Sequence, residues 1–141
     1  MEGAQEPSLT RPSLRGVLET VLYYTSDDEA AMLAFYEQVL GLRPVGMGGR
    51  AFRVTTAQVV LLFDAARSAS QDDPPPHGAH GKVHACFLVD EANYGRWKQR
   101  LRDHRVEITR ELEWKGGRRS FYFEDPARNV LEIADGDLWL D

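Results

Sequence analysis

The chain has 141 residues, 43% of them hydrophobic, and its 17 basic and 22 acidic residues give a net charge of −5. This size fits one domain or two small modules, and the acidic balance argues against a nucleic-acid-binding protein. The single cysteine, Cys86, excludes an internal disulfide and a cysteine metal cage. The longest strictly apolar run, residues 59–63, is too short to cross a membrane, and residues 1–15 lack a secretory signal. We therefore expect a soluble cytoplasmic protein with no nucleic-acid or membrane partner.

The first predicted module covers residues 16–65, after a tail at 1–15 that we expect to be mobile. An alternating run at 17–24 predicts a β-strand. A helix is expected over about residues 29–40, because apolar side chains recur there at helical spacing: Met32, Phe35, Tyr36, Val39 and Leu40. A short strand near 42–45, a glycine-rich turn and two strands within 50–64 complete the order β-α-β-β-β.

Residues 66–81 form a predicted linker. Three consecutive prolines, residues 74–76, argue against a helix or an internal strand in this stretch. Connections of this length are often crossovers or functional loops. His77 and His80 lie here, either as part of a lid over a site or as surface histidines.

The second predicted module, residues 82–138, repeats the same order of elements. A strand is expected at 82–89, a helix at about 90–105, and further strands at 106–112, 120–123 and 129–134. Glu19 of the first module then corresponds to His84 of the second. The repeat predicts an α+β fold in which two βαβββ modules form a half-open mixed-sheet barrel, with helices outside and a cup inside.

The alternation of the strands assigns side chains to the helix-covered face or to the cup. Apolar residues at period two are expected under the helices: Leu18, Leu22, Val83, Phe87, Val89, Phe121, Phe123, Leu131 and Ile133. The opposite face carries Glu19, His84 and Glu132, and in the first module it is expected to include Val60 and Leu62.

Glu19, His84 and Glu132 are the ionisable groups in the middle of cup-facing strands. Each of them alone could face water on an open sheet. Two carboxylates and an imidazole that converge on one cavity can pair with one another only in part, whereas a divalent cation would satisfy all three. The pattern therefore favours a metal site.

Four segments resemble the vicinal oxygen chelate superfamily, which includes glyoxalase I, fosfomycin-resistance thiol transferases, extradiol dioxygenases and bleomycin-resistance proteins. The segments are LETVLYY at 18–24, EAAMLAFYEQVLGL at 29–42, HACFLVD at 84–90 and SFYFEDPARNVLEI at 120–133. The resemblance implies paired βαβββ modules around a metal cup. It places metal ligands at His84, at Glu132 and at Glu19, with Thr20 as the alternative if the first strand is shifted. A fourth carboxylate, typical of glyoxalases, is missing, and we expect Leu62 at its position.

The resemblance and the predicted positions around the cup assign further residues. Tyr122 matches a tyrosine that contacts substrate in fosfomycin-type enzymes, so Tyr122 and Glu132 are the candidate catalytic residues. Tyr23 and Arg118 are candidate substrate contacts. Arg118 lies with Lys115 near the Gly116-Gly117 turn, which could also be a solvated hairpin tip.

We predict a metal-dependent enzyme in which a divalent ion (Mn, Fe, Ni, Co or Zn) chelates adjacent oxygens of a small-molecule substrate. Lyase, isomerase, thiol transferase and dioxygenase chemistry all remain open. The alternative is a metal-free protein of the bleomycin-resistance type that binds or sequesters a ligand. In either case we expect a homodimer, because short two-module chains of this superfamily commonly complete their cups by pairing.

Overall fold

The computed structural model describes residue 3 and residues 11–140 of the chain, and the predicted order of elements is confirmed in both modules. The first module contains, in chain order, β1 (Glu19–Tyr24), a 3-10 turn (Ser26–Asp28), α1 (Glu29–Ala34) with a π-helical continuation (Phe35–Val39), β2 (Arg43–Gly46), a second 3-10 turn (Met47–Gly49), β3 (Ala51–Thr55) and β4 (Gln58–Asp64). The second contains β5 (His84–Leu88), α3 (Glu91–Asp103), β6 (Arg110–Glu113), β7 (Arg119–Glu124) and β8 (Val130–Ala134).

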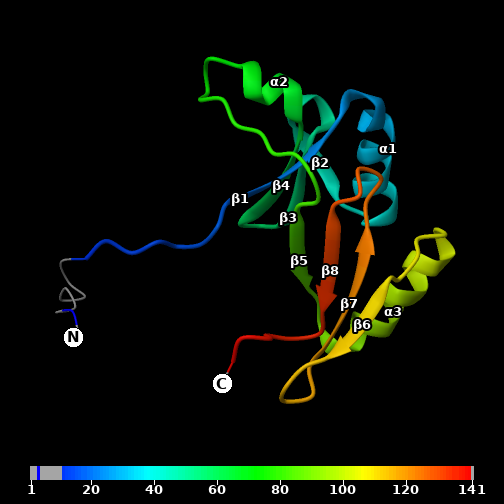
Figure 1. Ribbon diagram of the computed structural model, residues 1–141. Helices are drawn as coiled ribbons and strands as arrows, with labels where there is room; N and C mark the ends of the chain where they lie inside the picture. Colours follow the sequence, from blue (N-terminus) through cyan, green and yellow to red (C-terminus); the bar gives the residue numbers. More distant parts are fainter. Residues whose placement is uncertain (1–2, 4–10, 141) are drawn as a thin grey trace.

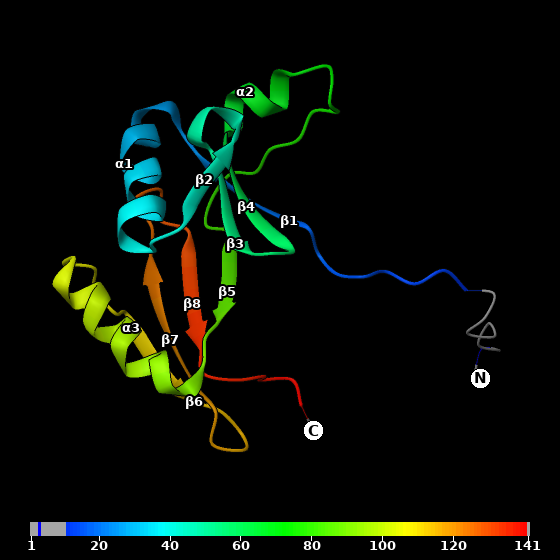
Figure 2. The same ribbon diagram turned by 180° about the vertical axis from the view of Figure 1, so that it is seen from behind.

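Each module has its own four-stranded mixed sheet, with the orders β1-β4-β3-β2 and β5-β8-β7-β6. The first and last strands of each module pair in parallel, and the remaining pairs are antiparallel. Both α1 and α3 lie on the same side of the molecule, as Figures 1 and 2 show from opposite directions. The helical stripe predicted for α1 packs into the core, where Met32 and Tyr36 are completely buried. This fold is the predicted α+β arrangement of two βαβββ modules.

The predicted linker contains a short helix, so the expectation that it holds no helix is wrong. Helix α2 (Ala65–Ser70) directly follows β4, and the Asp64 carboxylate accepts hydrogen bonds from the backbone amides of Ala66 and Arg67. A cap of this kind stabilises the first turn of a helix. The prolines begin at Pro74, after α2 has ended, and therefore do not interfere with it.

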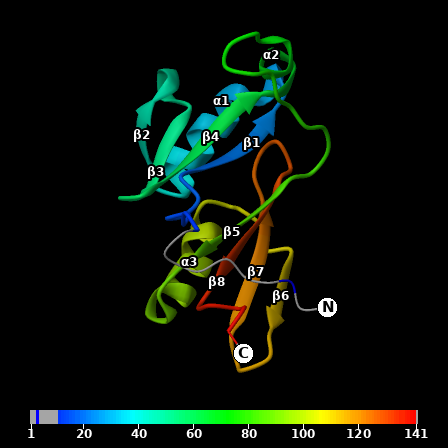
Figure 3. The same cartoon turned by 90° about the vertical axis from the view of Figure 1, so that its left-hand side faces the viewer.

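We call the face of each sheet that lies away from α1 and α3 the open face; Figure 3 looks onto it. The predicted position of two first-module residues on this face is wrong. Val60 and Leu62 pair with Thr20 and Leu22 in the β1–β4 register, and both are buried on the helix-covered face. Val59, Leu61 and Phe63 occupy the open face instead. Leu18 also differs from expectation: it precedes β1 and is 62% exposed.

Most of the expected tail at 1–15 lies outside the described residues, and residues 11–18 have no helix or strand. Among the described residues, no helix is both long and apolar enough to span a membrane.

Buried tyrosines make the fold sensitive to alkaline pH. The Tyr36 hydroxyl donates a 2.8 Å hydrogen bond to Asp125, and burial together with the negative charge of Asp125 raises its pKa well above the usual value. Burial also raises the pKa values of Tyr24 and Tyr94. The unfolded chain therefore releases these protons at lower pH than the folded chain.

We expect the free energy of unfolding to fall as the pH rises above about 10, by up to ~1.4 kcal/mol per pH unit for each tyrosine that stays protonated only when folded. Urea unfolding at pH 8.5, 10 and 11 measures this slope. The Tyr36→Phe variant should show a shallower slope than wild type, and an unchanged slope would contradict the assignment.

Candidate functional site

The two sheets place Glu19 and His84 at equivalent positions. In the parallel registers Glu19 lies opposite Val59, and His84 lies opposite Val130. The flanking hydrogen bonds are also the same, because the Val59 amide donates to the Leu18 carbonyl and the Val130 amide to the Val83 carbonyl, both at 2.8 Å. Glu19, rather than Thr20, is thus the first-module counterpart of His84.

The same registers identify the first-module counterpart of Glu132. Glu132 lies opposite Cys86, two residues after His84, and Leu61 lies opposite Val21, two residues after Glu19. The position of the missing fourth carboxylate is therefore Leu61, and the expectation of Leu62 is wrong by one residue. Leu61 is apolar and supplies no metal ligand.

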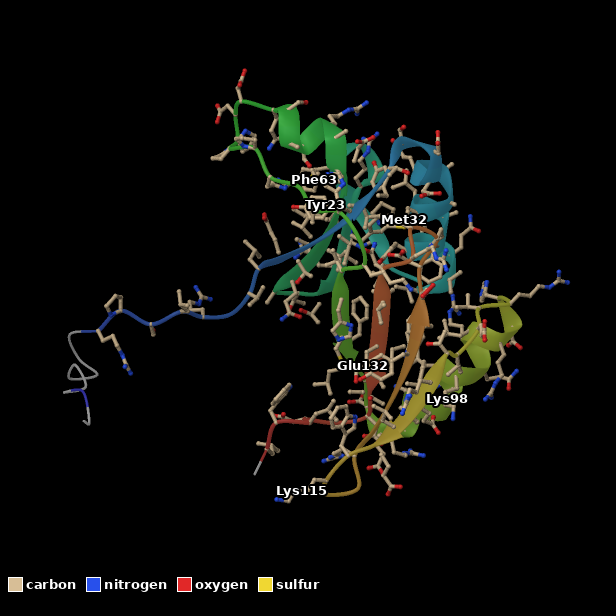
Figure 4. All side chains as sticks on the ribbon, viewed as in Figure 1. Tyr23, Met32, Phe63, Lys98, Lys115 and Glu132 are labelled. Atoms are coloured by element: carbon tan, nitrogen blue, oxygen red, sulfur yellow. The ribbon has the colours of Figure 1, made fainter. Side chains whose placement is uncertain are left out.

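His84 and Glu132 lie together on the open face of the second module, and Figure 4 shows Glu132 projecting from β8. The His84 Nε2 is 3.2 Å from the Glu132 Oε1, while its Nδ1 is 2.8 Å from the Val130 carbonyl oxygen. A carbonyl only accepts hydrogen bonds, so Nδ1 must carry a proton. In a neutral His84 the Nε2 lone pair then faces the carboxylate, and a cation between the two atoms would satisfy both.

The surroundings of Glu132 also favour a bound cation. Its side chain is only 6% exposed, and its Oε2 atom is buried without a hydrogen-bond partner. A buried charged oxygen without a partner is costly. The separation of Oε1 and Nε2 also suits two ligands of one ion, which lie about 3.0–3.4 Å apart when each bond is ~2.1 Å long. His84 and Glu132 therefore fit a divalent metal ion as two of its ligands.

Two further polar side chains adjoin Glu132. Tyr122 lies opposite it in the β7–β8 register, and the Tyr122 ring stacks on His84 with the ring centres 6.1 Å apart. Burial and the negative charge of Glu132 raise the pKa of Tyr122, so its hydroxyl stays a hydrogen-bond donor. The same two causes raise the pKa of the Cys86 thiol to about 12, which argues against Cys86 as an activated nucleophile.

Glu19 does not join His84 and Glu132 within one chain. No three His, Cys, Asp or Glu side chains of the described residues lie close enough together to hold a metal ion. Glu19 is exposed on the open face of the other module, and His84 has half of its side chain exposed to solvent. A single chain thus presents two of the three predicted ligands together and the third separately.

The loop after α2 places His77 on the open face of the first module. Its Nδ1 is 2.7 Å from the Tyr23 hydroxyl, and its ring meets the ring of Phe63 edge-on at 4.6 Å. Figure 4 shows Tyr23 and Phe63 close together below α2. The His77 amide also donates to the Ser68 carbonyl, which ties the loop to α2. His77 is therefore a half-buried part of this face, whereas His80 is exposed.

Replacement of Tyr23 by Phe should loosen this loop. The lost hydrogen bond is expected to lower the free energy of unfolding by roughly 0.5–1.5 kcal/mol. Hydrogen exchange of the His77 amide should accelerate, while exchange in α3 stays unchanged as an internal control. Unaltered protection of the His77 amide would show that Tyr23 does not hold the loop.

The remaining predicted residue of the site, Arg118, is half-buried and directly precedes the first residue of β7. Its guanidinium group packs against the Gly136 backbone, where a β-carbon would come within 2.6 Å of it. Lys115 lies in the exposed turn. Arg110, for which the sequence pattern indicated no role, lies opposite Tyr122 in the β6–β7 register and thus shares the open face with it. The role of Arg110 could not be predicted because β6 begins at Arg110, four residues after the predicted start of this strand.

Comparison with known proteins identifies the family. The profile of the Glyoxalase/Bleomycin resistance protein/Dioxygenase superfamily matches residues 18–133, which include both modules. The chain belongs to this superfamily. Its fold agrees with the assignment: a lactoylglutathione lyase from Agrobacterium tumefaciens superposes with a TM-score of 0.81 at 36% identity, covering 91% of this chain and 98% of the lyase.

Two other proteins are similar to this chain at lower sequence identity. The metallothiol transferase FosB of Staphylococcus epidermidis is 26% identical over 120 residues, which are 82% of this chain and 79% of the transferase. A glyoxalase/bleomycin resistance protein/dioxygenase from Nocardioides shares the fold with a TM-score of 0.69 at 19% identity, covering 95% of this chain and 93% of that one. The relatives thus include enzymes, at modest sequence identity.

Proposed function

We propose that this superfamily member is a divalent-metal-dependent enzyme that acts on a small molecule with two adjacent oxygen atoms. His84 and Glu132 of one copy and Glu19 of a second copy would hold the ion in a homodimer. The proposal is supported most directly by Glu132, whose buried Oε2 has no partner while its Oε1 faces the His84 Nε2. The metallothiol transferase and the lyase among the relatives favour enzyme chemistry over simple binding.

A second copy is needed because the open faces of one chain do not bring Glu19 to the other two ligands. A symmetric dimer would bring the first module of each copy to the second module of its partner and would form two equal sites.

Each group at such a site would have a separate role in binding the metal or the substrate. The metal, when bound, would hold both substrate oxygens and withdraw electron density from them. Tyr122 would donate a hydrogen bond to one of these oxygens. The Val130 carbonyl would fix the ring of His84 through Nδ1, so that Nε2 keeps its direction. Because Leu61 replaces the fourth carboxylate, a reaction that moves a proton at carbon would need another base.

Complementation between two defective variants tests the shared site. Glu19→Ala and His84→Ala should each bind no metal as homodimers. In a mixed dimer, one site receives Glu19 from the His84→Ala copy and the other two ligands from the Glu19→Ala copy, so it is complete. Co-expression with two different affinity tags isolates this mixed dimer. We expect it to hold about half of the wild-type metal content by elemental analysis, with a matching share of lactoylglutathione turnover if that is the reaction.

The results separate the alternatives. A mixed dimer without metal, beside a metal-binding wild type, would show that the site is not shared in this way. A wild type that binds no divalent ion would favour the metal-free ligand-binding protein of the bleomycin-resistance type instead. The separate position of Glu19 within one chain is the observation that supports this second function.

A further inference from the structure

Two arginines face each other on the open face of the first module. Arg43 lies directly opposite Arg53 in the antiparallel β2–β3 register, and Arg53 lies opposite Val59 of β4. Val59 in turn lies opposite Glu19 of β1. Opposite residues of neighbouring strands share a face, so these four residues form one row across the sheet, which we call the arginine row.

The opposed charges of Arg43 and Arg53 in this row destabilise the sheet. Like charges directly opposite each other on neighbouring strands destabilise a sheet. Within residues 11–140, neither Arg43 nor Arg53 forms an ion pair, whereas Arg50 pairs with Glu29 and Arg119 pairs with Asp135. Arg53 is also half-buried, so its charge is not fully solvated.

We propose that Arg43 and Arg53 bind the anionic group, a carboxylate or a phosphate-type group, of the molecule that occupies the cup. Guanidinium groups bind such oxyanions through paired, charge-assisted hydrogen bonds, and two of them suit a group with two negative charges. An anion between the two guanidinium groups would offset the repulsion between their positive charges.

The arginine row also limits the shape of this ligand, an argument that rests on the proposed function. Arg53 lies two strands away from Glu19, on the order of 10 Å at ~4.8 Å per strand. If Glu19 helps to hold the metal, the anionic group must be separated from the metal-bound oxygens by several bonds. The substrate, or a second substrate that reacts with it, is therefore an elongated anion rather than a small diketone alone.

Anion binding by the metal-free protein tests the proposal without any assay of activity. The probes are inorganic phosphate and succinate, each compared with sodium chloride at the same ionic strength, with thermal melting and calorimetric titration as readouts. Wild type and Arg67→Gln, a change at an exposed arginine of α2, should bind the better of the two probes equally. Arg53→Gln and Arg43→Gln should each bind it roughly tenfold more weakly.

The melting temperature without anion tests whether Arg43 and Arg53 repel each other. Without anion, Arg53→Gln should melt at or above the wild-type temperature, because the like-charged pair is gone. The proposal would be overturned if Arg53→Gln and Arg67→Gln bound the probe anion equally well. It would also be overturned if wild type bound phosphate and succinate no more strongly than chloride. Preference for phosphate or for succinate decides between the two anion types.

The same titration on His84→Ala separates this inference from the proposed function. That variant should lose the response to metal and keep the binding of the anion. A wild type that does not bind metal would therefore refute the metal site only. Equal anion binding by wild type and Arg53→Gln would refute the anion site at Arg43 and Arg53 only.

Discussion

Addition of Mn²⁺, Co²⁺, Ni²⁺ or Zn²⁺ should raise the melting temperature of the wild-type protein by several degrees at pH 7.5. A ligand that binds only the folded state stabilises it by about 2.7 kcal/mol at a hundredfold excess over its dissociation constant. The physical reason lies at Glu132, whose carboxylate is buried with Oε2 unpartnered and with Oε1 facing the His84 Nε2, so an ion held by these two residues would compensate the buried negative charge. Thermal melting with EDTA and with each ion measures the effect.

His84→Ala should abolish this shift, and His104→Ala provides the matched control, because His104 is exposed at the end of α3. Glu132→Gln should also abolish the shift, yet its metal-free form should be at least as stable as wild type, since a neutral amide replaces a buried carboxylate whose Oε2 has no partner. A shift that persists in His84→Ala would place the ion elsewhere. A wild type that does not respond to any of the ions would refute the metal-dependent enzyme.

The sequence allowed the elements of the fold to be predicted because most strands alternate clearly. In β7 Phe121 and Phe123, and in β8 Leu131 and Ile133, lie two positions apart, which indicated that Tyr122 and Glu132 lie on the open face. Strand β4 contains apolar residues at every position from 59 to 63, so alternation could not reveal its faces. Its parallel pairing with β1, a tertiary feature, decides that Leu61 rather than Leu62 is the counterpart of Glu132.

The site could be predicted only in part for a similar reason. His84 and Glu132 lie on two paired strands of one module, so the phase of each strand was sufficient to bring them together. The relation of Glu19 to them depends on how modules pair, and no local pattern encodes that. The position of His77 depends on contacts with Tyr23 and Phe63, which are far away in sequence. The arginine row is visible only once the β2–β3 register is known.

A buried carboxylate, that of Asp125, holds the turn between β7 and β8. Asp125 is 3% exposed, and its carboxylate accepts hydrogen bonds from the Tyr36 hydroxyl, from the backbone amide of Ala127, and from both the backbone and the side-chain amide of Asn129, at 2.8–3.0 Å. Asn129 also donates to the Tyr23 carbonyl at 3.1 Å. This cluster therefore joins the π-helical continuation of α1 and the strand β1 of the first module to the last hairpin of the second.

Replacement of Asp125 by Ala should lower the free energy of unfolding by about 3 kcal/mol or more. It removes all four acceptor contacts. The buried Tyr36 hydroxyl is then left without a partner, the Asn129 side-chain amide keeps only the Tyr23 carbonyl, and each unsatisfied buried polar group costs about 1–3 kcal/mol. Tyr36→Phe should cost less, because three donors to Asp125 remain. Urea unfolding at pH 7.5 measures both effects.

Asp137→Ala is the matched control for this change. Asp137 is exposed and accepts one hydrogen bond, from the Trp139 amide, so its loss should alter the free energy of unfolding by no more than ~0.5 kcal/mol. The double variant Tyr36→Phe/Asp125→Ala should be less destabilised than the sum of the two single variants, because both remove the same hydrogen bond. Additive losses, or a loss for Asp125→Ala as small as that for Asp137→Ala, would show that the cluster does not hold the two modules together.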